Sequence, residues 1–274
     1  MTPAEEWSLR LGRQLVELGV EPAEAERLAQ DSHDEAWNSG RAPMELYGPA
    51  SVYAASLAQA VRTAQPELAA GPAGEVVLRL SQVSKRYGRQ LVFDGVDLTL
   101  RAGEVAAVVG ANGCGKSTLL KICCGMTAAS GGLVERTPRI GYAPQHGGVS
   151  DLLTPDEHFR LFGAVHRMSR RTAVSTGTHL CKQLGWRPKR GQAAAQLSGG
   201  TQQKLNVVLS ELNRPDLILL DEPYQGFDQA TYLDFWEQVF KWRDAGAGVL
   251  VVTHLLQDLD RVDHLLELHR PEDS

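Results

Sequence analysis

The sequence predicts an α/β protein with a parallel sheet covered on both faces, preceded by a small all-α unit. Three observations predict this class. Short apolar runs at 105–109, 217–220 and 249–252 do not alternate with polar residues, which is typical of parallel strands buried on both faces. Apolar residues recur at helical spacing through the first 65 residues and again over 150–195. A glycine-rich loop separates the first apolar run from a helical segment.

Composition and charge narrow the class of partner. The chain has 274 residues, of which 43 % are hydrophobic and 22 % are charged, as in ordinary globular proteins. A formal net charge of −5 argues against nucleic acid as the main partner, because nucleic-acid-binding proteins usually show a basic excess. No apolar run reaches the roughly 18–20 residues that span a bilayer, and the acidic first residues do not resemble a signal peptide. We therefore expect a cytoplasmic protein whose role at any membrane depends on another polypeptide.

The four cysteines, Cys114, Cys123, Cys124 and Cys181, favour a reducing compartment. None belongs to a C-x-x-C pair, and Cys114 lies within the glycine-rich loop, where a disulfide would be disruptive. The adjacent Cys123 and Cys124 could form a redox site, but small core residues on a helix are the simpler interpretation.

Residues 1–65 have a composition of their own, rich in Ala, Glu, Leu and Arg. Apolar side chains recur there at helical spacing, and prolines open new helical segments. The apolar positions are Trp7, Leu11, Leu15 and Leu18, and the prolines are Pro22, Pro43 and Pro49. We expect a small helical domain of three or four helices, then a linker at 66–74 and a larger domain at 75–270. The helical domain is either an interaction or regulatory module or a stabilising extension.

The larger domain is expected to begin with two strands. Val76, Leu78 and Leu80 alternate with other residues as the first strand. A second alternating strand is expected over 96–100, after a turn at Asp94–Gly95.

The glycine-rich loop fits the phosphate-binding pattern G-x-x-x-x-G-K-[ST] and lies between the expected strand and helix, as that pattern requires. Glycines let the backbone curl so that several amide N–H groups point at one anion, and the N-terminus of the new helix adds partial positive charge. Lys116 would reach the β- and γ-phosphates, and the hydroxyl of Ser117 would bind Mg²⁺. The candidate nucleotide-binding residues of this loop are Gly110, Asn112, Gly113, Cys114, Gly115, Lys116, Ser117 and Thr118.

Two carboxylates follow the apolar strand at 217–220. Asp221 is placed to hold Mg²⁺, as in other phosphate-loop enzymes. Glu222 could act as the general base that polarises the attacking water, a role typically worth about 10²–10⁴-fold in rate. A lone Asp-Glu pair after a strand would be weak evidence, but together with the phosphate loop it predicts a nucleotide triphosphatase.

A second phosphate-binding device follows from Ser198, Gly199 and Gly200, which open a helical segment. A hydroxyl, backbone amides and a helix N-terminus together can bind an anion. The chain therefore has one phosphate loop but two phosphate-binding motifs.

With these motifs in their order, residues 75–270 resemble the ATP-binding cassette (ABC) ATPases. Leu197 to Thr201 resembles the family signature. The resemblance assigns four further residues: Tyr87 stacks on adenine, Gln145 contacts Mg²⁺ and water, Asp228 is the loop aspartate and His254 is the switch histidine. It implies a RecA-like core, an antiparallel β-subdomain, and an α-helical subdomain at about 150–210.

The same resemblance implies how the protein works. Family members bind ATP and Mg²⁺ and form a head-to-tail dimer, with an identical or a different cassette, in which two ATP molecules are enclosed. The signature of one protomer closes on the phosphate loop of the other, and hydrolysis loosens the interface. The helical subdomain would dock an integral membrane permease on a separate chain, which predicts a cytoplasmic protein held peripherally at the inner face of the cell membrane.

Three departures from the family pattern stand out. Thr201 replaces a commoner glutamine, and Tyr224–Asp228 replaces the usual Ser-x-Leu-Asp, which leaves the neighbours of Asp228 without an assigned contact. The span from Lys116 to Gln145 is short, so its strands are expected to be trimmed. Because the hydrolytic positions are filled, we expect an active ATPase.

Two function classes remain. The first is the ATP-hydrolysing subunit of an ABC transporter, with an ABC-2-type exporter favoured because the chain ends soon after His254. The second is a soluble cassette ATPase that remodels a non-transport complex. A basic cluster within the helical region is either a solvated face or a contact with anionic lipid headgroups. Its members are Arg167, Arg170, Arg171, Lys182, Arg187, Lys189 and Arg190.

Overall fold

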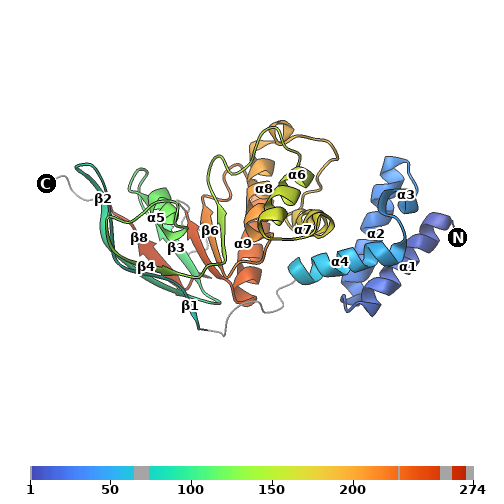
Figure 1. The fold of residues 1–274 in the computed structure, drawn as a ribbon, viewed down its shortest axis with the longest axis horizontal. Helices are drawn as coiled ribbons and strands as arrows, with labels where there is room; N and C mark the ends of the chain where they lie inside the picture. Colours follow the sequence, from blue (N-terminus) through green and yellow to red (C-terminus); the bar gives the residue numbers. More distant parts are fainter. Residues whose placement is uncertain (1, 65–73, 228, 254–260, 270–274) are drawn as a thin grey trace.

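The computed structural model describes residues 2–64, 74–227, 229–253 and 261–269. It contains a helical N-terminal unit, a three-stranded antiparallel sheet, a five-stranded parallel sheet, and helices that lie between the sheets and the N-terminal unit (Figure 1). The expected α/β class is therefore confirmed. No helix within the described ranges is both long and apolar enough to cross a membrane.

Four helices form the N-terminal unit: α1 (Pro3–Glu17), α2 (Pro22–Ser39), α3 (Pro43–Tyr47) and α4 (Ala50–Ala64). Thr2 caps α1 through a reciprocal capping box with Glu5, which satisfies amide groups that the first helical turn leaves free. The unit has a hydrophobic core of its own, which includes Trp7, Leu11, Leu15, Val20, Leu28, Ala54 and Leu57. Leu18, the last of the four apolar positions noted in the sequence, instead caps the C-terminal end of α1 and is 40 % exposed.

The antiparallel sheet has the strand order β2-β1-β4. Its strands are β1 (Val76–Tyr87), β2 (Gln90–Arg101) and the short β4 (Gly131–Arg136). The expected turn at Asp94–Gly95 is wrong, because β2 runs through it. The pairing shifts by one residue there: Val83 pairs with Val96, whereas Lys85 pairs with Phe93. Gly95, with φ of 64°, lets β2 take up the extra residue as a bulge, and the strands turn back instead between Tyr87 and Gln90.

The parallel sheet has the order β5-β6-β7-β3-β8. Its strands are β3 (Val105–Val109), β5 (Ile140–Ala143), β6 (Leu217–Asp221), β7 (Gly248–Val252) and β8 (His264–Glu267). Every residue of β3, β6 and β7 is buried, which explains why these strands are apolar throughout. The carboxyl ends of β3, β5 and β6 lie along one edge of the sheet, where the motif residues follow them.

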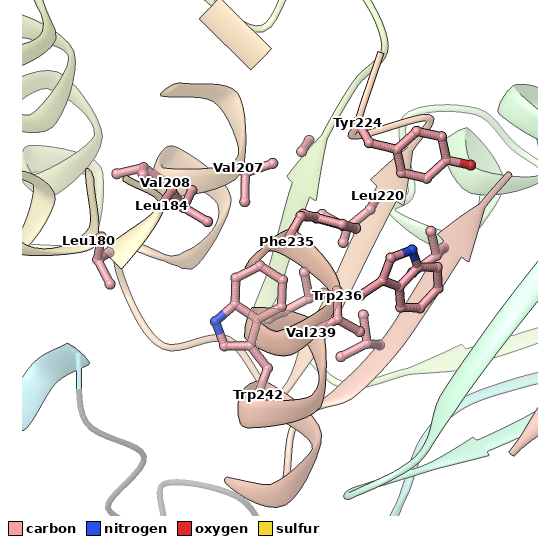
Figure 2. Packing of buried hydrophobic residues seen from close by; sticks show 14 of the residues in the cluster. Leu180, Leu184, Val207, Val208, Leu220, Tyr224, Phe235, Trp236, Val239 and Trp242 are labelled. Atoms are coloured by element: carbon pink, nitrogen blue, oxygen red, sulfur yellow. The ribbon is translucent and has the colours of Figure 1, made fainter. Parts of the chain in front are cut away.

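Helices cover the two faces of this sheet. α5 (Lys116–Cys123) packs with the antiparallel sheet against one face, and α8 (Gly199–Glu211) and α9 (Gln229–Asp244) pack against the other. Figure 2 shows Phe235, Trp236 and Val239 of α9 close to Leu220 of β6. The predicted helical stretch over 150–195 contains α6 (Pro155–Val165), α7 (Arg170–Gln183) and a short 3₁₀ turn (Ala194–Gln196).

Candidate functional site

The phosphate loop joins β3 to α5, and its backbone requires glycine at both ends. Gly110 has φ of 148°, and a Cβ there would lie 2.3 Å from the carbonyl oxygen of Leu268. Gly115 has φ of 103°, and a Cβ there would lie 2.5 Å from the side chain of Val92. Left-handed backbone and close neighbours together exclude other residues, so the sequence can form this tight loop only with glycine at these positions.

Lys116, the first residue of α5, is folded back over the loop. Its Nζ donates to the carbonyl oxygens of Gly110 (2.7 Å) and Ala111 (3.1 Å), and the residue is only 6 % exposed. The ammonium group therefore lies over the loop, at the N-terminus of α5. A positive charge combined with a helix N-terminus suits a phosphate chain.

Ser117 and Asp221 connect the loop to the end of β6. The Ser117 hydroxyl donates to Oδ1 of Asp221 at 3.2 Å, and Asp221 is 3 % exposed. Burial raises the pKa of Asp221, and the hydrogen bond from Ser117 partly opposes that rise. A hydroxyl and a carboxylate are oxygen ligands of the kind that Mg²⁺ prefers, so the two residues fit this ion.

Glu222 and Gln145 form a second contact at the same edge of the sheet. Gln145, just after β5, donates from Nε2 to Oε2 of Glu222 at 2.9 Å. The backbone of Glu222 is left-handed, with φ of 47°, and its amide donates to the carbonyl oxygen of Val252 at 3.1 Å. Non-glycine residues in this conformation are strained and cluster at functional sites. The turn aims the Glu222 side chain at the loop that contains Gln145.

Gln225 also belongs to this cluster, although sequence reasoning did not single it out. Its Oε1 accepts a weak hydrogen bond from Gln145 at 3.4 Å. Gln225 lies in the segment that departs from the family pattern, and that departure was the available signal. Next to it, the hydroxyls of Tyr224 and Thr253 are hydrogen-bonded to each other, and both residues are buried. The tyrosine therefore fastens the divergent segment to the end of β7.

Tyr87 ends β1 and is 53 % exposed, so its ring is accessible for stacking. Lys85 Nζ lies 4.6 Å from the centre of that ring and donates to the carbonyl oxygen of Ala128 at 2.8 Å. Sequence reasoning missed Lys85. Residues two apart on a strand share a face, and this spacing could have identified it.

Ser198, Gly199 and Gly200 lie at the start of α8. The Ser198 hydroxyl accepts from the amide of Thr201 at 3.3 Å and contacts its hydroxyl at 2.8 Å. Its hydrogen bonds thus stay within the first turn of α8, and within the described ranges it does not bond to the phosphate loop of its own chain. A Cβ on Gly200 would lie 2.6 Å from the carbonyl oxygen of Gly226, so glycine permits this close approach.

Two predicted site residues, Asp228 and His254, lie outside the described residues. The remaining motif residues of the loop, Asn112, Gly113, Cys114 and Thr118, lie where the strand–loop–helix pattern placed them, between β3 and the first turn of α5. Cys123 faces the core, where burial raises the pKa of its thiol to about 12, so it holds its proton at neutral pH. This favours a packing role over redox chemistry for Cys123.

Comparison with known proteins agrees with this geometry. Residues 93–225 match the family described as ABC transporter. The chain is 36 % identical over 197 residues to the zinc import ATP-binding protein ZnuC of Paramagnetospirillum magneticum, with 71 % of this chain and 74 % of that protein covered. It is 30 % identical over 208 residues to the Nod factor export ATP-binding protein I of Cupriavidus pinatubonensis, with 71 % and 64 % covered. It is 27 % identical over 212 residues to the probable multidrug ABC transporter ATP-binding protein YbhF of Escherichia coli, with 73 % and 37 % covered.

Solved structures give the same fold. One, described as an ATP-binding subunit of an ABC transporter, has a TM-score of 0.64 and 27 % identity, with 70 % of this chain and 86 % of that chain covered. A dimeric bacterial ABC transporter cassette has a TM-score of 0.64 and 24 % identity, with 70 % and 94 % covered. The chain belongs to the ATP-binding subunits of ABC transporters, a family that hydrolyses ATP to power transport.

Proposed function

We propose that this chain is the ATP-hydrolysing subunit of an ABC exporter and drives membrane-spanning subunits on separate polypeptides. The main support is the pair of hydrogen bonds at the edge of the parallel sheet, Ser117 to Asp221 and Gln145 to Glu222. These bonds join the phosphate loop, the acidic pair and the segment that leads into the helical subdomain. A nucleotide in the loop can therefore influence all three.

In the proposed mechanism, Lys116 and the loop amides bind the β- and γ-phosphates. Ser117 and Asp221 would hold Mg²⁺, which supplies neutralisation of the phosphate charge during transfer. Glu222 accepts a proton from the attacking water, and Gln145 holds the Glu222 carboxylate in position. Tyr87 stacks on the adenine ring.

The second half of the site is proposed to come from another cassette, identical to this chain or related to it. Ser198, Gly199 and Gly200 begin α8, a helix of 13 residues, so amide groups and a helix N-terminus are presented together. Because Ser198 bonds within its own helix turn, the phosphate loop it serves is proposed to belong to a partner. Closure on ATP and opening after hydrolysis would transmit force through α6 and α7, and Asp228 and His254 keep the roles that the family resemblance implies.

Exposed apolar side chains support a protein partner for the helical subdomain. Leu152, seven residues after Gln145, is 88 % exposed, and Leu161 and Val165 on α6 are 53 % and 74 % exposed. Large exposed apolar side chains that gather on one subdomain are typical of protein interfaces. The proposed partner is a permease, which would hold the chain at the inner face of the cell membrane. The similarity to Nod factor export proteins favours export. The similarity to a zinc import protein means that a transport assay must exclude import.

The catalytic part of the proposal is tested with Glu222→Gln. This variant should bind ATP with unchanged affinity and hydrolyse it about 10²–10⁴-fold more slowly, because the amide cannot accept the proton. It should also form a longer-lived ATP-bound dimer in size-exclusion chromatography. Glu135→Gln is the matched control, since this carboxylate is half exposed and forms an ion pair with Arg79. Hydrolysis by Glu222→Gln at the parental rate would exclude Glu222 as the base.

The membrane part is tested by purifying the tagged chain from membranes and identifying the integral proteins that accompany it. Leu152→Glu combined with Val165→Glu should abolish their recovery while basal ATP hydrolysis is kept. Leu233→Glu, at another exposed leucine (51 %), is the matched control and should leave recovery unchanged. Recovery of soluble partners alone would favour the remodelling ATPase instead. If a permease is recovered, transport assays on vesicles that contain the complex, with the nucleotide outside, decide the direction.

A further inference from the structure

A cavity of 560 Å³ lies where the N-terminal unit meets the helical subdomain. Its walls come from α2, α3 and α4 on one side, and from α6, α7 and the loop at 188–191 on the other. The two units are joined there by Lys182 and Arg187, which both form ion pairs with Asp31 of α2. The volume is in the range of small-molecule sites. Figure 1 shows the N-terminal unit beside α7, and α4 is the helix of that unit nearest to α7.

The cavity walls are strongly basic, whereas the whole chain is acidic. Six lysine and arginine side chains line the cavity against two carboxylates, in a chain of formal net charge −5. Two of the cations already have partners: Arg160 lies 4.0 Å from Asp156, and Lys182 lies 3.7 Å from Asp31.

The other four cations form no ion pair within the described ranges; they are Arg170, Arg171, Lys189 and Arg190. Glu35 is the remaining carboxylate of the lining. The cavity therefore has an unneutralised positive surplus, and an anion would be favoured inside it. Most members of the basic cluster noted in the sequence thus lie around one cavity.

The wall formed by the N-terminal unit is aromatic and contains one carboxylate, Glu35. Tyr47 and Tyr53 stack with their ring centres 4.5 Å apart and an interplanar angle of 24°. His179 of α7 is 3 % exposed, and burial lowers its pKa to about 4, so the ring is neutral at pH 7. Nδ1 of His179 has no hydrogen-bond partner within the described ranges. One wall thus suits a phosphate group, and the other suits a flat ring.

We propose that this cavity binds a small organic phosphate, of about the size of a mononucleotide, distinct from the ATP at the phosphate loop. Its phosphate would contact Arg171 and Arg190, and its ring would lie near Tyr47 and Tyr53. Because both units contribute walls, the bound ligand stabilises the docked position of the N-terminal unit on α7. A concave, two-sided site favours such a ligand over a flat membrane surface.

The test is a calorimetric titration of AMP into the full chain that carries Lys116→Ala, so that the phosphate loop does not compete. AMP should bind, and more tightly than inorganic pyrophosphate, which has no ring. The double variant Arg171→Ala/Arg190→Ala should weaken AMP binding at least tenfold. Arg10→Ala is the matched control, since this exposed arginine on α1 forms an ion pair with Glu6 and does not line the cavity, and it should leave binding unchanged.

A second measurement removes the dependence on Lys116→Ala. In it, the Glu222→Gln variant, saturated with ATP and magnesium, is titrated with AMP. If the double arginine variant does not fold, Lys189→Ala on the exposed loop replaces it. Absence of AMP binding below about 1 mM in both settings would overturn the proposal. The proposal would also be overturned if the chain bound phosphatidylglycerol vesicles through Arg171 and Arg190 but did not bind AMP. ATP hydrolysis without AMP should be unchanged in the arginine variants, so this proposal and the proposed function fail separately.

Discussion

Glu211 at the end of α8 provides a prediction whose size follows from the structure. The residue is 7 % exposed, and burial raises the pKa of its carboxyl from 4.5 to about 8. The neighbouring indole of Trp242 and the guanidinium of Arg214 only partly oppose that rise. At pH 7 the group is therefore protonated in the folded protein and ionised in the unfolded chain.

The sign and the size of the effect of pH on the free energy of unfolding follow from proton linkage. Between pH 4.5 and about 8 the folded state binds the extra proton, so the free energy of unfolding falls as the pH rises through this range. The loss approaches about 1.4 kcal/mol per pH unit, or about 3 kcal/mol by pH 7. Glu211→Gln has nearly the same size and cannot ionise. The variant should thus be only about 1 kcal/mol more stable than the parent at pH 5 and about 3 kcal/mol more stable at pH 7.

Thermal unfolding, followed by tryptophan fluorescence between pH 5 and pH 8, measures this difference. For a chain of this size, 3 kcal/mol corresponds to a Tm increase of roughly 5–10 °C. Glu135→Gln, at a half-exposed carboxylate, is the control and should give the same Tm as the parent throughout. A Tm difference for Glu211→Gln that does not change with pH, or that has the opposite sign, would refute the reasoning.

Three further predictions concern the loop, the adenine contact and the docked N-terminal unit. Gly115→Ala should lower ATP affinity at least tenfold in calorimetry, because its Cβ would lie 2.5 Å from Val92. Gly19→Ala is the control and should leave ATP affinity unchanged, because Gly19 also has a left-handed φ, of 85°, but a Cβ there would meet open space. Tyr87→Ala should raise KM for ATP with kcat nearly unchanged, because stacking acts in the ground state; a matching fall in kcat would contradict this. Burial lowers the pKa of His179 from 6.5 to about 4, so the opened state of α7 binds a proton more readily than the folded state. The protection of α7 amides from hydrogen exchange, corrected for intrinsic exchange rates, should therefore fall when the pH is lowered from 7 to 5. His179→Gln should remove that pH dependence.

Local patterns predicted much of the fold. The apolar strand, the loop with its glycines and the following helix are adjacent in sequence, so their spacing alone predicts the phosphate loop. Prolines and capping residues likewise mark where α1, α2, α3 and α6 begin. The expected turn at Asp94–Gly95 was wrong because the same two residues serve equally well in a bulge, and the partner strand β1 decides between the two.

The candidate site, like the fold, was predictable from the sequence only in part. The types of its residues could be read from motifs, but their contacts join distant positions: Ser117 and Asp221 are 104 residues apart, and Gln145 and Glu222 are 77 apart. Parallel strand order brings these positions to one edge, and sequence spacing contains no information on that order. The contact of Gln145 with Gln225 depends on how the divergent loop folds back, so no motif predicted it.

What the sequence by itself determined is the chemistry: a phosphate loop, a pair of carboxylates and a serine–glycine helix start, each defined by residues that are neighbours in the chain. Only the tertiary structure decided where the N-terminal unit lies and that its helices enclose a basic cavity against α7. The reason is that docking depends on complementary surfaces and ion pairs, such as Asp31 with Lys182, whose partners come from separate segments of the chain.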